Sequence, residues 1–94
     1  MREWDVDLEF RASAALTDAT AEQVVESLAR YGGVVGYRGD HLSTRATVPA
    51  SDPAEALRIT RESLADATAD LELTAVEVRE AEPIEDGGRV RAAS

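Results

Sequence analysis

The chain of 94 residues contains no cysteine, no lysine and no asparagine, and only four of its residues are aromatic. Without cysteine, the protein cannot form a disulfide, use a thiolate nucleophile or bind a metal through sulfur. Because aromatic residues are so few, the core must consist mainly of valine, leucine and alanine. No hydrophobic run is long enough to span a membrane, and Arg2 and Glu3 do not resemble the start of a signal peptide. We therefore expect a cytoplasmic protein.

The charge is strongly unbalanced, with 19 acidic and ten basic residues and a formal net charge of −9. An acidic chain is a poor ligand for the phosphates of nucleic acids and for anionic membranes. We expect no direct binding to nucleic acid or membrane, and instead a basic or neutral protein partner. All ten basic residues are arginine and alanine is very frequent, which indicates a GC-rich bacterial source.

Residues 3–11 alternate between apolar and charged side chains, which is typical of a strand with one buried face. The apolar members are Trp4, Val6, Leu8 and Phe10. The acidic members, called the acidic ladder below, are Glu3, Asp5, Asp7 and Glu9. This alternation predicts that the acidic ladder lies on one face of a sheet, outside the core.

The rest of the chain predicts two helices, a hairpin and a last strand. Thr17-Asp18 can begin a helix whose apolar positions are Ala21, Val24, Val25 and Leu28, and Gly32-Gly33 can end it. Residues 34–37 and 42–48 read as two strands joined by a turn at 38–41, with Pro49 ending the second. Asp52, Pro53 and Glu55 form a strong helix start, ahead of a buried face of Leu57, Thr60, Leu64 and Ala67. A last strand begins at Leu71 or Leu73 and includes Val76 and Val78.

The order strand, helix, strand, strand, helix, strand predicts an α+β fold over residues 1–80. We expect a ferredoxin-like βαββαβ two-layer sandwich with an antiparallel sheet of order 4-1-3-2 and both helices on one face. The other face of the sheet would then be open. Residues 81–94 show no buried pattern, and we expect a flexible C-terminal tail that is dispensable for folding.

The most unusual surface is the expected open face, where side chains from two other strands should join the acidic ladder. These are His41, Arg45, Glu77 and Arg79. One interpretation is cross-strand ion pairing on a solvated sheet. The other is a docking surface for a basic partner or for a second copy of the chain. We treat all eight residues as candidate partner-binding residues.

We expect no catalytic residue, no metal site and no cofactor. His41 is the only histidine and lies near a turn, so no base and orienting group accompany a serine or threonine nucleophile. One histidine with scattered carboxylates does not form a recognisable metal-binding pattern.

The stretch from Ala19 to Arg79 resembles the ferredoxin-like N-terminal domain that short actinobacterial proteins carry ahead of a small helix-turn-helix. Four segments carry the resemblance, namely 27–33 (SLARYGG), 42–45 (LSTR), 52–57 (DPAEAL) and 75–79 (AVEVR). The residues after Arg79 are too few for a helix-turn-helix. The resemblance therefore implies the accessory domain without the DNA-reading part.

We expect a non-enzymatic, regulatory protein-interaction or dimerisation module. One alternative is a small-ligand sensor similar to ACT-type regulatory domains, with its ligand near the loop at residues 12–15. A second is an enzyme of the dimeric α+β barrel type, for which Tyr37 and His41 would be the available polar groups.

Overall fold

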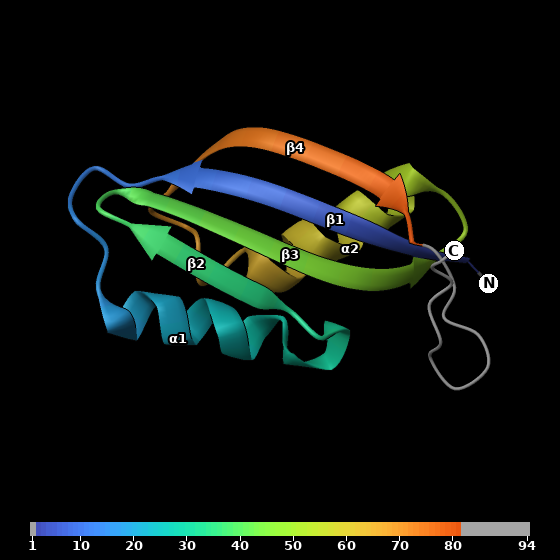
Figure 1. Cartoon of the computed structure of the whole chain (residues 1–94), viewed down its shortest axis with the longest axis horizontal. Helices are drawn as coiled ribbons and strands as arrows, with labels where there is room; N and C mark the ends of the chain where they lie inside the picture. Colours follow the sequence, from blue (N-terminus) through green and yellow to red (C-terminus); the bar gives the residue numbers. More distant parts are fainter. Residues whose placement is uncertain (1, 82–94) are drawn as a thin grey trace, which may run out of the picture.

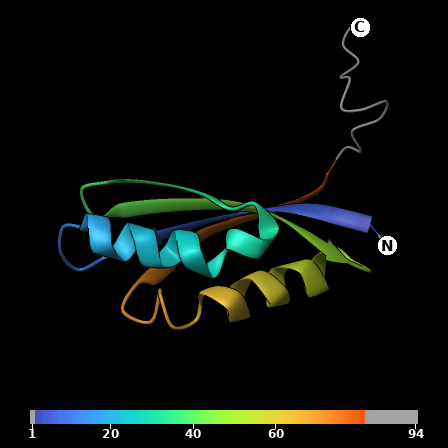
Figure 2. The same ribbon diagram turned by 90° about the horizontal axis from the view of Figure 1, so that it is seen from below.

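The computed structural model describes residues 2–81, which form a four-stranded antiparallel sheet with two α-helices on one face (Figures 1 and 2). The elements, in chain order, are β1 (Arg2–Arg11), α1 (Asp18–Ser27), the 3-10 helix η1 (Ala29–Tyr31), β2 (Val34–Arg38), β3 (His41–Ala50), α2 (Pro53–Leu64) and β4 (Glu72–Glu80). The tail predicted for residues 81–94 lies, from residue 82 onward, outside the described residues.

The hydrogen-bonded order of the strands is β2-β3-β1-β4, and this replaces the expected order 4-1-3-2. The two orders differ in the edge from which the strands are counted, β2 in one and β4 in the other. Each names the same three antiparallel pairs, β2 with β3, β3 with β1 and β1 with β4. The α+β class agrees with the prediction. β1 and β3 are central, and β2 and β4 form the two edges.

The core lies between the helices and the inward side chains of β1 and β3. The alternation of β1 is seen directly, because Val6 and Leu8 have no exposed surface and Trp4 and Phe10 have almost none. The indole Nε1 of Trp4 donates to the carbonyl of Ala50 over 3.1 Å, which satisfies the one polar atom of that side chain. The remaining buried apolar residues are Val24, Leu28, Leu42, Ala46, Val48, Ala50, Ala56 and Leu64.

The first helix ends earlier than the sequence predicts. Thr17 is its N-cap and accepts a hydrogen bond from the amide of Thr20, but the α-helix stops at Ser27 and the short helix η1 follows. Gly32 then adopts the left-handed conformation, with φ 63°. A Cβ on Gly33 would lie 2.3 Å from the Cβ of Leu28, so the second glycine allows the chain to pass directly over this core residue.

The start of the second helix is as predicted. The carboxylate of Asp52 accepts from the amide of Glu55 over 2.8 Å, and Pro53 occupies the first turn, where no amide hydrogen is needed. The carboxylate of Glu55 reaches back and accepts from both the amide and the hydroxyl of Ser51, each over 2.7 Å. These bonds to Ser51 lower the pKa of Glu55 below its ordinary value.

The expectation about Pro49 is wrong, and two apolar side chains, Val25 and Val76, are more exposed than other apolar side chains of the same elements. Pro49 does not end its strand, because β2 stops opposite Arg45 and the missing amide of Pro49 faces no neighbouring strand. Val25 is 42% exposed and lies at the margin of α1, not in the core. Val76 is 45% exposed, although it pairs with the buried Leu8, because β4 is an edge strand that α2 covers only in part.

We predict that Leu8→Ala and Leu28→Ala each lower the free energy of unfolding by about 2–4 kcal/mol, because each truncation leaves a cavity among fully buried side chains. Val25→Ala, in the same helix segment as Leu28, is the control and should cost well under about 1 kcal/mol. Chemical denaturation measures all three. Equal losses for Leu28→Ala and Val25→Ala would contradict the core described here.

The low pKa of Glu55 predicts a pH dependence of stability. Because its pKa is lower in the folded state, the ionised carboxylate stabilises the fold above the unfolded value of 4.5, and this contribution is lost as the pH falls through the folded value. The melting temperature should therefore fall more steeply between about pH 5 and about pH 3 for the wild type than for Glu55→Gln. Parallel curves for the two proteins would show that the carboxylate does not have this role.

Candidate functional site

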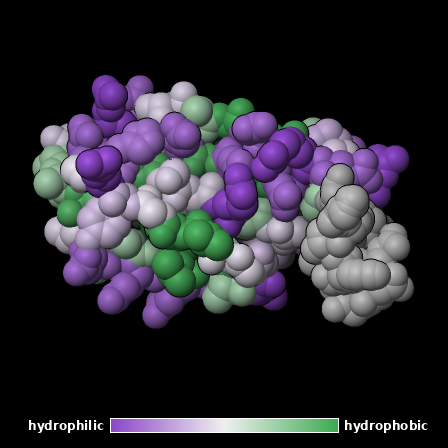
Figure 3. Space-filling model, in the orientation of Figure 1, coloured by the Kyte–Doolittle hydropathy of each residue, from purple (hydrophilic) through white to green (hydrophobic). Residues whose placement is uncertain are grey.

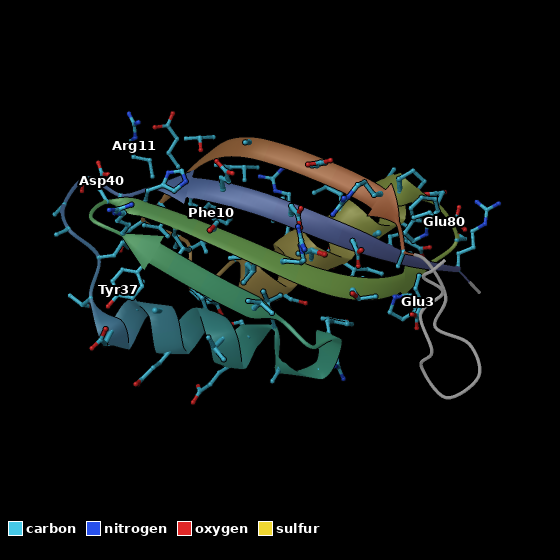
Figure 4. All side chains as sticks on the ribbon, in the orientation of Figure 1. Glu3, Phe10, Arg11, Tyr37, Asp40 and Glu80 are labelled. Carbon is cyan, nitrogen blue, oxygen red and sulfur yellow. The ribbon has the colours of Figure 1, made fainter. Side chains whose placement is uncertain are left out.

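The face of the sheet opposite the helices is bare in the described structure, and it carries the acidic ladder (Figure 2). Glu3 lies at the end of the sheet where Glu80 lies, and Arg11 lies at the other end near Asp40 (Figure 4). All eight residues predicted for this surface have register positions on this face. Their role in binding stays a prediction. Their contacts separate Asp7, which is paired with arginines inside the face, from the other carboxylates of the acidic ladder.

Asp7 is held inside the face by two arginines. Arg45 on β3 donates from Nε to Oδ1 over 2.7 Å and from Nη2 to Oδ2 over 3.1 Å, and this bond raises the pKa of Arg45. Arg79 on β4 places Nη2 3.6 Å from Oδ2. The Asp7 side chain is only 22% exposed. Its carboxylate is therefore largely neutralised within the sheet and has little capacity left for a partner.

The other carboxylates of the acidic ladder are less engaged. Asp5 accepts one hydrogen bond from the hydroxyl of Thr47, over 2.8 Å. Glu9 lies 3.4 Å from Nε2 of His41, a contact that is an ion pair only when the histidine is protonated. Within residues 2–81, no ion pair joins the side chain of Glu3 to another residue. These three carboxylates are the part of the acidic ladder that faces solvent.

A hollow of about 430 Å³ lies on the same face, over β2 and β3. Its floor is low because Gly36, which has no side chain, pairs with Ser43, whose side chain is small. Its rim includes Glu9, Arg45 and Val34. Val34 is 65% exposed. Figure 3 shows this face largely in polar colours, with an apolar patch in the region of β2. Sequence reasoning missed this hollow, although the small side chains at 36 and 43 and the outward valine are its signal.

Two further hollows lie outside the open face. One, of about 600 Å³, follows the side of α2 that faces β4, and it is lined by apolar side chains that include Leu57, Leu71 and Leu73. The other, of about 260 Å³, lies beside the loop at residues 12–15, where a ligand-sensing domain would bind. Its lining includes Gln23, Asp66 and Asp70.

Tyr37 and His41, the polar pair expected for a barrel-type enzyme, lie on opposite faces of the sheet. Tyr37 is paired with the buried Leu42 and donates its hydroxyl to Asp18 of α1, which raises the pKa of Tyr37 (Figure 4). His41 contacts Glu9 on the open face. Because the sheet separates the two side chains, they cannot act on the same substrate atom.

Within the described residues, no group of three or more histidine, aspartate or glutamate side chains is placed to hold a metal ion. None of the helices in residues 2–81 is long and apolar enough to cross a membrane.

No protein-family model and no curated protein matches this chain. Among solved structures, the chain is similar to the crystal structure of a hypothetical protein from Methanocaldococcus jannascii. The two share 13% sequence identity with a TM-score of 0.43, over 96% of this chain and 90% of the other.

Proposed function

We propose that this protein is a non-enzymatic interaction module, and that its open sheet face binds a protein partner through a basic side chain. The observation that carries the proposal is the hollow between Val34 and Glu9, whose floor is formed by Gly36 and Ser43. An apolar wall beside a carboxylate matches the chemistry of arginine and lysine, which bury an aliphatic stem and keep a charged head near an acceptor.

The charge of the surroundings supports a basic partner. Glu3 and Asp5 extend the negative charge along β1 beyond Glu9, whereas Asp7 is held by Arg45 and Arg79. A partner with several basic residues would therefore meet a row of available carboxylates. Such a row steers association and selects the sign of the partner's charge more than it adds affinity. In our proposal the contact is regulatory, and the protein acts in the cytoplasm.

The proposal can be tested with two peptides of five residues, one alternating alanine with arginine and one alternating alanine with glutamate. We predict that the arginine peptide shifts the NMR amide signals of Glu9, Gly36 and Ser43, more weakly at high salt, and that the glutamate peptide does not. Glu9→Gln should weaken arginine-peptide binding by about tenfold, since it removes the available charge. Glu22→Gln, on the exposed side of α1, is the matched control and should leave binding unchanged.

A second variant tests the hollow and not the charge. A Cβ at Gly36 would meet only Oγ of Ser43, at 3.9 Å, so Gly36→Val fits the strand and fills the hollow. We expect it to fold as the wild type does and to lose peptide binding. Binding that is the same for Glu9→Gln, Gly36→Val and Glu22→Gln, or no binding of the arginine peptide to the wild type, would overturn the proposal.

A further inference from the structure

The bare edge of β4 is a second surface, and it is independent of the open face. Among residues 2–81, β4 pairs only with β1, so the nine residues of this strand have a free outer edge. The opposite edge is different, because β2 has five residues and α1 packs against it. A long edge strand is a template for pairing with another strand unless charge, proline or a covering element prevents it. Proline is absent from β4, and Val76 on this strand is 45% exposed.

The direction of each backbone group along β4 follows from one hydrogen bond. The amide of Ala81 donates to the carbonyl of Glu3 over 2.9 Å. Antiparallel pairs alternate between hydrogen-bonded and non-hydrogen-bonded positions, and the register of β1 with β4 is unbroken between positions 75 and 80. The residues whose backbone amide and carbonyl groups point toward β1 are therefore Ala75, Glu77 and Arg79. The residues that turn theirs outward, to the free edge, are Val76, Val78 and Glu80.

We propose that β4 pairs with β4 of a second copy of this chain, antiparallel, about a two-fold axis through Val78. This register places Val78 opposite itself and Val76 opposite Glu80, so that the outward backbone groups of all three residues find partners. It joins the two sheets into one continuous sheet with the helices of both copies on the same face. The exposed Val76 gains a neighbouring strand.

Charge complementarity selects this register and points to a second copy as the occupant. Glu77 and Arg79 both have open-face positions, and the two-fold axis at Val78 sets Glu77 of each copy opposite Arg79 of the other. Within residues 2–81 their mutual contact is long, at 3.7 Å, and neither side chain makes a hydrogen bond. Glu77 therefore keeps acceptor capacity for the second copy, and Arg79, which also lies 3.6 Å from Asp7, keeps guanidinium N–H groups that can donate to it. Opposite charges at facing non-hydrogen-bonded positions stabilise an antiparallel pair.

The two neighbouring registers are less favourable. An axis through Glu77 would set the two Glu77 carboxylates directly opposite each other, where like charges repel. An axis through Arg79 would set the two Arg79 guanidinium groups directly opposite each other and would leave Glu77 facing Ala81, with no compensating charge. Only the axis at Val78 gives two opposite-charge pairs.

The first test is sedimentation of the full chain over a range of concentrations. We expect a monomer–dimer equilibrium for the wild type. Glu77→Arg and Arg79→Glu should each weaken the dimer by about tenfold or more, since each sets two like-charge pairs in the interface. The double variant Glu77→Arg with Arg79→Glu should restore it, because the exchanged charges pair again. Circular dichroism checks that each variant folds, and Glu62→Arg on α2 is the control for net charge.

The second test reads the register directly, because the natural chain has no cysteine. Facing residues of a hydrogen-bonded antiparallel pair have Cα atoms about 5.5 Å apart, a spacing that a disulfide can bridge. Val78→Cys should form a covalent dimer under mild oxidation, whereas Val76→Cys, displaced along the strand from its own copy, should not. A wild type that stays monomeric, charge variants that leave the dimer unchanged, or equal cross-linking at 76 and 78 would each overturn the proposal. None of these outcomes bears on peptide binding at Glu9 and Gly36.

Discussion

The alternation of side chains along β1 is the constraint on which the rest of the molecule depends. β1 is paired on both sides, so its backbone is fully used by β3 and β4, and only its side chains can differ between the two faces. Four apolar side chains on one face form the centre of the core. The carboxylates on the other face cannot enter that core without a large cost of desolvation. This difference determines which face the helices cover and keeps the acidic ladder at the surface.

The two candidate surfaces arise from the same shortage of covering elements. Within residues 2–81, two helices cover one face of a four-stranded sheet and the other face has no second layer, and α2 covers β4 only in part, since Val76 is 45% exposed. The bare face carries charge, which suits a partner selected by its sign. The bare edge carries backbone groups and an exposed valine, which suit another strand. In our proposal these two kinds of chemistry separate partner binding at Glu9 from self-association at Val78.

Much of this fold can be predicted from local pattern. The inward and outward faces of β1 and β3 follow from a period of two, and the start of α2 follows from the side-chain chemistry of Asp52, Pro53 and Glu55. What local pattern cannot predict is how far across the sheet each helix extends. Val76 has an inward register position, yet its exposure depends on where α2 lies across the sheet. Similarly, the sequence places Asp7 and Glu9 on one face, but only the positions of Arg45 and Arg79 show that Asp7 is neutralised and Glu9 is available. To predict the hollow at Gly36, one must know both the register of the hairpin and that this position has no side chain.

Amide hydrogen exchange along β4, followed by NMR in dilute and in concentrated solution, tests the central claim most directly. β4 should use alternate amides for β1 and for a second copy. The amides of Ala75, Glu77 and Arg79 should exchange slowly at every concentration, because they bond to β1. Those of Val76, Val78 and Glu80 should exchange quickly in dilute solution and become slow as the concentration rises. Rapid exchange of the first set would contradict the register of the sheet, and exchange of the second set that does not depend on concentration would contradict pairing at the free edge.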